Sequence, residues 1–454
     1  MENMLRLVTG RIGCGKTARI YEEIRKITEQ GGEVTLVVPE QYSFHTEKKM
    51  LEMLGARGAD RVNVVSFSFL AKNLLKKYGL NSEKSLDDST RAMLMSVALD
   101  EAGDDLQVYS RHRYSPAVIL QMLKTLKDFR QCSVTSDKIE ETLAKLKPSL
   151  LKDKLGEILL IDRTYTALVE QNYFDDDCAL DILCDVLDEH RDFDGAEVFV
   201  DGFRGFTAQE YAVLERIMHQ SAETWVTLCV DKADDEFGVF AHTFRTKRKL
   251  IRCAQKSGTD IAKPELLTRD GSIDPELNAL EKGLYSGGAE IYGEKTKKIT
   301  LCSAEDFESE CEFVACTIKR LIRTENIRCR DIAVISRSEN NYSRQIRSAL
   351  IKNGVPVFED KRQPITSEPL IEFVRSAIEI GTSGFSTDAL MRLAKTGLTD
   401  LTIEEIAKIE NYALMWQING KKWLDEWTAH PNGLGEKMLE KDAAELREIN
   451  DTRI

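Results

Sequence analysis

The sequence predicts an α/β protein with a mostly parallel sheet, an all-helical insertion and a second, smaller α/β unit. Near the N-terminus, short apolar runs alternate with helical patterns, and further along a long helical stretch carries no strand signal. Of the 454 residues, 42% are hydrophobic and 31% are charged, as in globular chains. No apolar run approaches the ~18 residues of a membrane helix. Arginines and lysines also interrupt the first twenty residues, which argues against a secretory signal.

The first seventy residues predict the beginning of the sheet. Leu5–Val8 is a short apolar run, a glycine-rich loop follows at Gly10–Gly15, and isoleucines at helical spacing predict a helix from Thr17 to about Glu29. Two further apolar runs predict strands at Val34–Val38 and Val62–Val65. Strands that alternate with helices in this way are typical of a parallel sheet covered on both faces.

Between about residues 80 and 192 only helical patterns occur. Ser115 followed by Pro116 predicts a helix start, and other helices are expected from Ser136 and over Lys152–Gln171. The sheet resumes with a strand at Glu197–Val200. A capping box at Thr207–Glu210 then opens a helix, and Trp225–Val230 is the next expected strand.

A polar stretch at 255–298 predicts a connection to a second α/β unit. This unit is expected to contain strands at Ile299–Leu301 and Asp331–Ile335 and helices at Glu308–Arg323 and Tyr342–Asn353, with helices alone after Ile378. The expected domains are therefore 1–80 with 193–290, a helical insertion at 81–192, the second unit at 295–377, and a further helical insertion at 378–454.

The strongest motif is a phosphate-binding loop. Its residues fit G-x-x-x-x-G-K-[ST] between a strand and a helix: Gly10, Arg11, Ile12, Gly13, Cys14, Gly15, Lys16 and Thr17. Glycines let backbone N–H groups surround a phosphate chain, Lys16 would neutralise the β- and γ-phosphates, and the Thr17 hydroxyl would bind Mg²⁺. The alternative is a glycine turn with a solvated lysine. The motif predicts ATP and Mg²⁺ as ligands.

Such a site needs an acidic residue at the end of a neighbouring strand. Asp201 follows the apolar run Val198–Val200 and is the expected second magnesium ligand, although such an aspartate can also simply cap a strand end. The ten cysteines and six histidines lack metal-ligand spacing. Three acids at Asp175–Asp177 fit the start of a helix better than a metal cluster. Trp416, Trp423 and Trp427 fit a buried helix face better than a base-stacking surface.

The order of phosphate loop, helical insertion and strand ending in aspartate resembles superfamily 1 helicases of the UvrD type, which have RecA-like domains. The closer resemblance is to AddB (RexB) proteins, subunits of a bacterial helicase–nuclease that processes double-strand DNA ends. Besides residues 5–17, five segments carry it: Leu36–Phe44, Val65–Leu70, Val200–Thr207, Asp331–Arg337 and Gly354–Phe358.

The sequence differs from active helicases at positions that serve ATP hydrolysis. Gly202 stands where active relatives carry the Glu that activates water, no Gln follows in Val230–Glu236, and no adenine-contacting Gln segment precedes Gly10. The resemblance therefore implies ATP binding with weak hydrolysis, and no catalytic residue is assigned. Arg337 matches the position of an arginine that approaches the γ-phosphate, although a surface contact is the alternative.

The resemblance also implies contacts with single-stranded DNA. Five residues match DNA-touching segments: Gln41, Ser43, Phe44, Ser66 and Phe67. Core packing is the alternative for the two phenylalanines. A net charge of −13 argues against a surface that clamps nucleic acid everywhere, but not against a local basic channel.

The expected role is that of a non-motor, DNA- and ATP-binding region of a cytoplasmic complex for recombinational break repair. The resemblance implies an AddA-type partner, DNA ends, a Chi-type sequence, and no membrane. It places a nuclease domain and an iron–sulfur cluster in later parts of the full-length protein, so that the chain looks like an N-terminal portion. Two alternatives remain. One is an active DNA-dependent ATPase with a displaced base such as Glu210, and the other is an unrelated small-molecule kinase.

Overall fold

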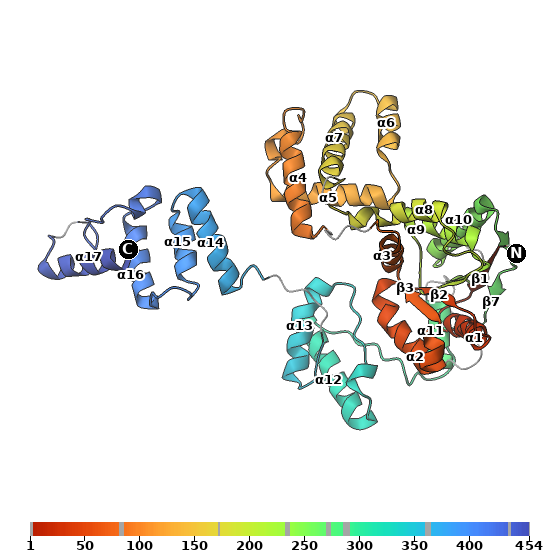
Figure 1. The fold of residues 1–454 in the computed structure, drawn as a ribbon. Helices are drawn as coiled ribbons and strands as arrows, with labels where there is room; N and C mark the ends of the chain where they lie inside the picture. Colours follow the sequence, from red (N-terminus) through yellow and green to blue (C-terminus); the bar gives the residue numbers. More distant parts are fainter. Residues whose placement is uncertain are drawn as a thin grey trace. The chain divides into compact units, whose positions relative to one another are not determined.

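The computed structural model describes residues 3–80, 86–170, 173–231, 237–268, 274–284, 291–358, 365–434 and 437–453. The chain divides into two compact units, Met1–Leu301 and Cys302–Ile454. Figure 1 shows the helices and strands of each unit along the chain. Among the described residues, no helix combines the length and the apolar character that crossing a bilayer requires.

The first unit is built on a seven-stranded sheet, and all its pairings are parallel. The strand order is β3-β2-β4-β5-β1-β6, and β7 also pairs with β1. The strands are Met4–Thr9 (β1), Val34–Val37 (β2), Val62–Val65 (β3), Glu197–Val200 (β4), Glu223–Leu228 (β5), Asp260–Ile261 (β6) and Glu265–Leu266 (β7). The predicted fold class is confirmed. However, the stretch 255–298 is more than a connection, because it supplies β6 and β7, two strands too short to show a hydrophobic period.

Helices cover both faces of this sheet, which explains why its strands are continuously apolar. On one face, side chains such as Leu7, Val200 and Val226 share a core with residues of α3, α8, α9 and α10. On the other face, Val8 and Phe199 pack with residues of α1 and α2. These helices are Lys16–Glu29 (α1), Ser43–Ala59 (α2), Phe67–Lys77 (α3), Ala179–Glu189 (α8), Ala208–Gln220 (α9) and Ala241–Ser257 (α10), with Pro275–Gly283 (α11) later in the chain.

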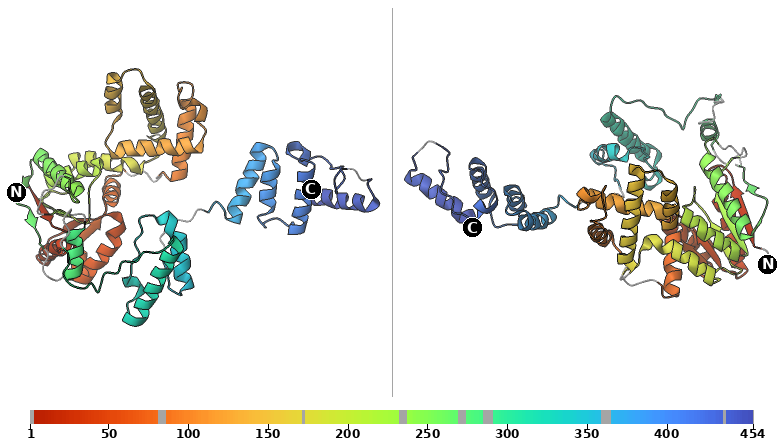
Figure 2. Two further views of the ribbon diagram at one scale, coloured as in Figure 1. Left: turned by 180° about the vertical axis from the view of Figure 1, so that it is seen from behind. Right: turned by 90° about the horizontal axis from the view of Figure 1, so that it is seen from above.

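The insertion between β3 and β4 is helical, as predicted, and has its own core (Figures 1 and 2). That core contains Met95, Leu99, Met122 and Ile161. The helices are Asp88–Glu101 (α4), Pro116–Gln131 (α5), Ser136–Lys145 (α6) and Leu150–Glu170 (α7). Ser115 and Pro116 do open α5, and the capping box that opens α9 is formed as predicted.

The second unit differs from the prediction. Its described residues contain the helices Phe307–Glu325 (α12), Glu339–Lys352 (α13), Pro369–Ser383 (α14), Thr387–Ala394 (α15), Ile403–Met415 (α16) and Glu440–Arg453 (α17), and no strand. The strand predicted at Asp331–Ile335 is therefore wrong for this structure. The strand predicted at Ile299–Leu301 is wrong as well, because this end of the first unit is not part of its sheet. An apolar run becomes a strand only beside another strand that accepts its backbone hydrogen bonds, and the described part of the second unit supplies none. Leu301 and Ile335 are accordingly 97% and 93% exposed.

The tryptophans near the end of the chain belong to a core, as predicted. Trp423 and Trp427 are buried, and Tyr412 stacks on Trp427 with ring centroids 4.8 Å apart. The shared helix face is wrong, however. Trp423 ends a short 3₁₀ turn at Gly420–Trp423, and Trp416 caps α16.

Candidate functional site

The phosphate-loop motif lies where β1 ends and α1 begins. Gly15 is the residue before α1 and adopts a left-handed conformation with φ of 85°, which favours glycine. The first turn of α1 holds no acidic residue. The positive end of the helix dipole therefore faces the loop without a carboxylate to neutralise it, an arrangement suited to binding an anion.

Close packing fixes the start of this loop. A side chain at Gly10 would place its Cβ 2.4 Å from Cys14 Sγ and 2.6 Å from the backbone oxygen of Leu267. Leu267 directly follows β7, and its N–H donates to the oxygen of Thr9 at 2.8 Å. Only a glycine at position 10 therefore fits between the Leu267 oxygen, next to β7, and the Cys14 side chain.

The Lys16 ammonium lies across the loop. Its Nζ donates to the carbonyl oxygens of Gly10, at 2.9 Å, and Arg11, at 2.8 Å. Both acceptors belong to the segment that the motif predicts will enclose a phosphate. Phosphate oxygens can replace neutral carbonyls as acceptors with a gain in electrostatic attraction.

Thr17 and Asp201 meet although 184 positions separate them. The Thr17 hydroxyl donates to Asp201 Oδ2 at 2.8 Å, and the hydroxyl of Thr227, on β5, donates to Asp201 Oδ1. Asp201 is only 8% exposed. Burial and the nearby charge of Asp201 together raise the pKa of Tyr21, on α1. One hydroxyl and one carboxylate from adjacent elements fit the protein share of a magnesium site, whose other ligands are phosphates and water.

Thr227 is a site residue that no sequence motif marked. It is 3% exposed and stands between the buried apolar residues Val226 and Leu228 of β5. A polar side chain in a buried strand needs a hydrogen-bond partner, and this requirement was the available signal.

Among the described residues, neither Gly202 nor Glu210 provides an obvious base for hydrolysis near Asp201. Gly202 has φ of 83°, so a glutamate at this position would occupy strained backbone, and its Cβ would lie 3.4 Å from Pro39 Cδ. Glu210 completes the capping box, because its Oε2 accepts the Thr207 N–H at 2.7 Å. The segment Val230–Glu236, which lacks a glutamine, lies outside the described residues from 232 onward.

The Arg11 side chain points away from the loop interior. Its guanidinium pairs with Asp231 at 3.0 Å and Glu281 at 3.1 Å, and lies 5.4 Å from the centre of the Phe240 ring. A cavity of about 440 Å³ adjoins the loop, within the size range of ligand pockets. It is lined by Gly10, Arg11, Cys14, Val230, Asp231, Leu266, Leu267, Thr268 and Lys282.

Arg337 belongs to the second unit, where its side chain is exposed. Its approach to a γ-phosphate in the first unit stays a prediction.

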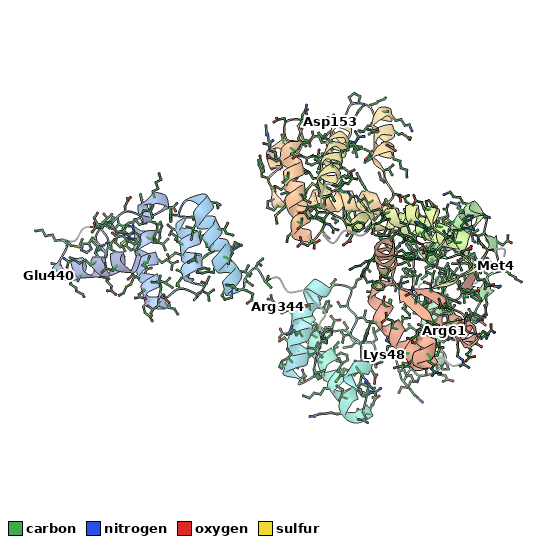
Figure 3. All side chains as sticks on the ribbon, viewed as in Figure 1. Met4, Lys48, Arg61, Asp153, Arg344 and Glu440 are labelled. Atoms are coloured by element: carbon green, nitrogen blue, oxygen red, sulfur yellow. The ribbon has the colours of Figure 1, made fainter. Side chains whose placement is uncertain are left out.

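The five predicted DNA-contact residues fall into two groups. Gln41 and Phe44 are exposed, Phe44 to 80%, and Ser43 is half-buried, at the start of α2. Lys48 projects from the same helix (Figure 3). This segment is therefore available to a strand of nucleic acid.

Ser66 and Phe67 are buried in this structure, and their contact with DNA stays a prediction. Ser66 caps α3 by accepting the Phe69 N–H at 3.2 Å. Phe67 is 3% exposed and packs edge-on against Phe203 and Phe206, with ring centroids 5.5 and 6.1 Å away. In this structure the ring of Phe67 is therefore packed in the core, which was the alternative to a DNA contact.

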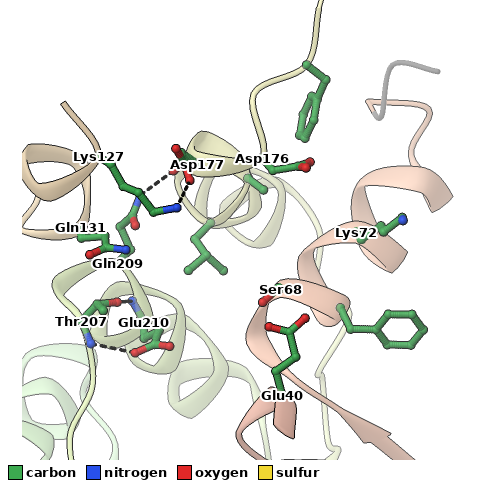
Figure 4. A pocket seen from close by; sticks show the side chains of 14 residues that line it. Glu40, Ser68, Lys72, Lys127, Gln131, Asp176, Asp177, Thr207, Gln209 and Glu210 are labelled. Atoms are coloured by element: carbon green, nitrogen blue, oxygen red, sulfur yellow. Dashed lines mark hydrogen bonds and ion pairs between the residues drawn. The ribbon is translucent and has the colours of Figure 1, made fainter. Parts of the chain in front are cut away.

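Phe69, which no sequence pattern singled out, is the exposed aromatic of α3, at 51%. With Glu40 and Lys72 it borders a cavity of about 610 Å³ between α3, α5, α8 and α9. Figure 4 shows Lys127 pointing across this cavity to Asp177, with an ion pair of 3.0 Å, and the capping pair of Thr207 and Glu210. Carboxylates outnumber lysines in its lining and no phosphate-loop residue is among them, so we do not assign it as a phosphate site.

The acidic run Asp175–Asp177 has a structural role. Asp175 caps the short 3₁₀ turn before α8 and pairs with Arg91 at 3.0 Å and with Arg130. These contacts tie the helical insertion to the sheet domain. Among the described residues, no group of three or more Cys, His, Asp or Glu side chains could hold a metal ion.

Comparison with known proteins gives two family matches. The family described as "ADDB, N-terminal" matches residues 7–281, and the "UvrD-like helicase C-terminal domain" matches residues 239–416. The second match begins within the first unit and includes α10.

Individual relatives align with nearly the whole chain. Proteins named as the B subunit of an ATP-dependent helicase/deoxyribonuclease align with 99% of the chain in Caldanaerobacter subterraneus, at 31% identity, and with 98% in a Thermoanaerobacter species, at 32%. The Clostridium novyi relative is 31% identical over 96% of the chain. The chain spans about two fifths of the length of these relatives, 40%, 40% and 39% respectively.

Proposed function

The chain belongs to the AddB family, and from this premise we propose that it binds Mg-ATP and DNA as a non-motor, helicase-like region of an AddB-type subunit. The observation that carries the nucleotide part is the hydrogen bond of 2.8 Å between Thr17 and Asp201 beside the phosphate loop. The loop, the helix dipole and Lys16 would hold the phosphates. Mg²⁺ held by Thr17 and Asp201 would screen their charge.

Two residues near Asp201 support the proposal that the chain is not a motor. ATP hydrolysis needs a base that orients and activates water. Gly202 offers no side chain, and the carboxylate of Glu210 accepts a backbone N–H in the capping box of α9. Bound nucleotide would then hold the protein in one conformation and would not drive movement along DNA.

The DNA part of the proposal uses the exposed segment at the start of α2. Gln41 and Phe44 offer an amide and an aromatic ring, which suit backbone contact and base stacking. The names of the relatives state that they are subunits. We therefore propose an AddA-type partner, DNA ends as substrate, recognition of a Chi-type sequence, and a role in the repair of double-strand breaks.

The rival function is an active DNA-dependent ATPase. ATP turnover by the native chain, measured with and without single-stranded DNA, separates the two. We expect turnover far below the ~1 s⁻¹ at the low end of typical enzymes, with no stimulation by DNA. Vigorous DNA-stimulated turnover that Lys16→Ala removes would contradict the non-motor proposal and favour the rival.

A further inference from the structure

Helix α10 carries a row of cations on its exposed face. Its buried residues Thr243, Thr246, Leu250 and Ala254 pack against the first unit. The exposed side of the helix carries Arg248 and five further basic side chains at alternating spacings of three and four residues, here called the α10 stripe. The stripe consists of His242, Arg245, Lys249, Arg252 and Lys256. At a helical rise of about 1.5 Å per residue, the stripe is about 21 Å long.

The arginines and lysines of the stripe have few acidic neighbours. In the same unit, Arg19 pairs with Glu23 and Arg25 with Glu29, one turn along α1. Helix α10 contains no Asp or Glu at all. Among the described residues, the one ion pair of the stripe joins Lys256 to Glu215 at 2.7 Å. An array of like charges at turn spacing repels itself, so an external anion would stabilise it.

The chemistry of the stripe favours the backbone of duplex DNA as that anion. None of the exposed large apolar side chains lies on α10. The stripe therefore lacks the aromatic and apolar side chains that anchor protein–protein interfaces. It also lacks the aromatic rings that stack on the bases of single-stranded DNA. A straight, rigid row suits a stiff polyanion. Each DNA strand carries a phosphate every ~3.4 Å along the axis, which gives a dense array of negative charge for the stripe to meet.

The stripe also adjoins the loop that follows Asp201. The Thr246 hydroxyl donates to the Arg204 oxygen at 3.2 Å, and a Cβ at Gly205 would lie 2.7 Å from His242 Cε1. Arg204 is itself exposed. We propose that the α10 stripe binds the sugar–phosphate backbone of duplex DNA next to the nucleotide site. This inference deepens the proposed function and rests on its claim that the chain acts on DNA.

The test is the variant Arg245→Ala/Lys249→Ala/Arg252→Ala. The control, Lys124→Ala/Lys145→Ala/Lys147→Ala, removes the same charge from exposed positions of the helical insertion. Fluorescence anisotropy with a labelled blunt duplex and with labelled oligo-dT is measured over a range of salt concentrations, and a fluorescent ATP analogue checks the nucleotide site.

We expect the stripe variant to lose about tenfold or more in duplex affinity, and its slope of log K against log salt to become shallower by about two to three. Affinities for oligo-dT and nucleotide stay as in the native chain, and the control keeps native duplex binding. A native chain that binds duplex, with the stripe variant matching it in affinity and slope, overturns this inference alone. A native chain that binds oligo-dT but no duplex also overturns it and leaves the proposed function standing. No binding to either DNA overturns both.

Discussion

Replacing Gly10 by alanine is expected to abolish tight nucleotide binding. The new Cβ would lie 2.6 Å from the backbone oxygen of Leu267, which cannot rotate away as a side chain can, and 2.4 Å from Cys14 Sγ. The φ of 153° also disfavours any residue with a side chain. The loop or β7 must shift, and the N–H groups that would face the phosphates shift with it. We expect an affinity loss of at least about tenfold, together with a loss of about 1–3 kcal/mol in the free energy of unfolding.

A titration with a fluorescent ATP analogue and a urea unfolding curve measure the two effects. Gly156→Ala is the matched control, because Gly156 lies within α7 and a Cβ there meets nothing within 4 Å. That substitution should leave nucleotide affinity unchanged and stabilise the fold by about 0.5–1 kcal/mol. Native affinity in a folded Gly10→Ala protein would show that this loop does not contact the nucleotide.

Asp201→Asn is expected to remove the contribution of Mg²⁺ to nucleotide binding. Asparagine has the shape of aspartate, and the hydroxyls of Thr17 and Thr227 can both turn to donate or accept, so the buried hydrogen bonds can be kept. The negative charge that attracts the cation is lost. We expect Mg-ATP affinity to fall about tenfold or more, to the level that the native chain shows with EDTA.

The measurement is the same titration with and without Mg²⁺. Asp188→Asn, an exposed carboxylate that pairs with Arg216 on the surface, is the matched control and should keep the native Mg²⁺ response. An Asp201→Asn protein that still binds nucleotide more tightly with Mg²⁺ would exclude Asp201 as a ligand of the cation.

The sheet of the first unit was predictable because its strands are buried on both faces. The apolar runs at β2, β3 and β4 coincide with the observed strands to within one residue. The same signal failed at Ile299–Leu301 and Asp331–Ile335. An apolar run shows that a segment could become a strand, whereas the neighbouring strand that it needs is a property of the fold.

The positions of the glycine-rich loop between β1 and α1 and of Asp201 after β4 were also predictable, since a motif and a strand end depend on local sequence. Local sequence did not show that Phe67 points into the core while Phe69 is exposed. Which face of α3 meets the sheet is decided by packing against Phe203 and Phe206, far along the chain. Thr227 was missed for a similar reason, because only the parallel order β4-β5-β1 places its hydroxyl beside Asp201.

The measurement that tests the account most directly is an equilibrium titration of the native chain and Lys16→Ala with a fluorescent ATP analogue and Mg²⁺. Lys26→Ala, on the exposed side of α1, serves as the control of equal charge. The account predicts saturable binding by the native chain and the control, and binding weakened by at least about tenfold in Lys16→Ala. Equal binding by all three proteins, or none by any of them, would contradict the claim that the loop at residues 10–17 is a working nucleotide site.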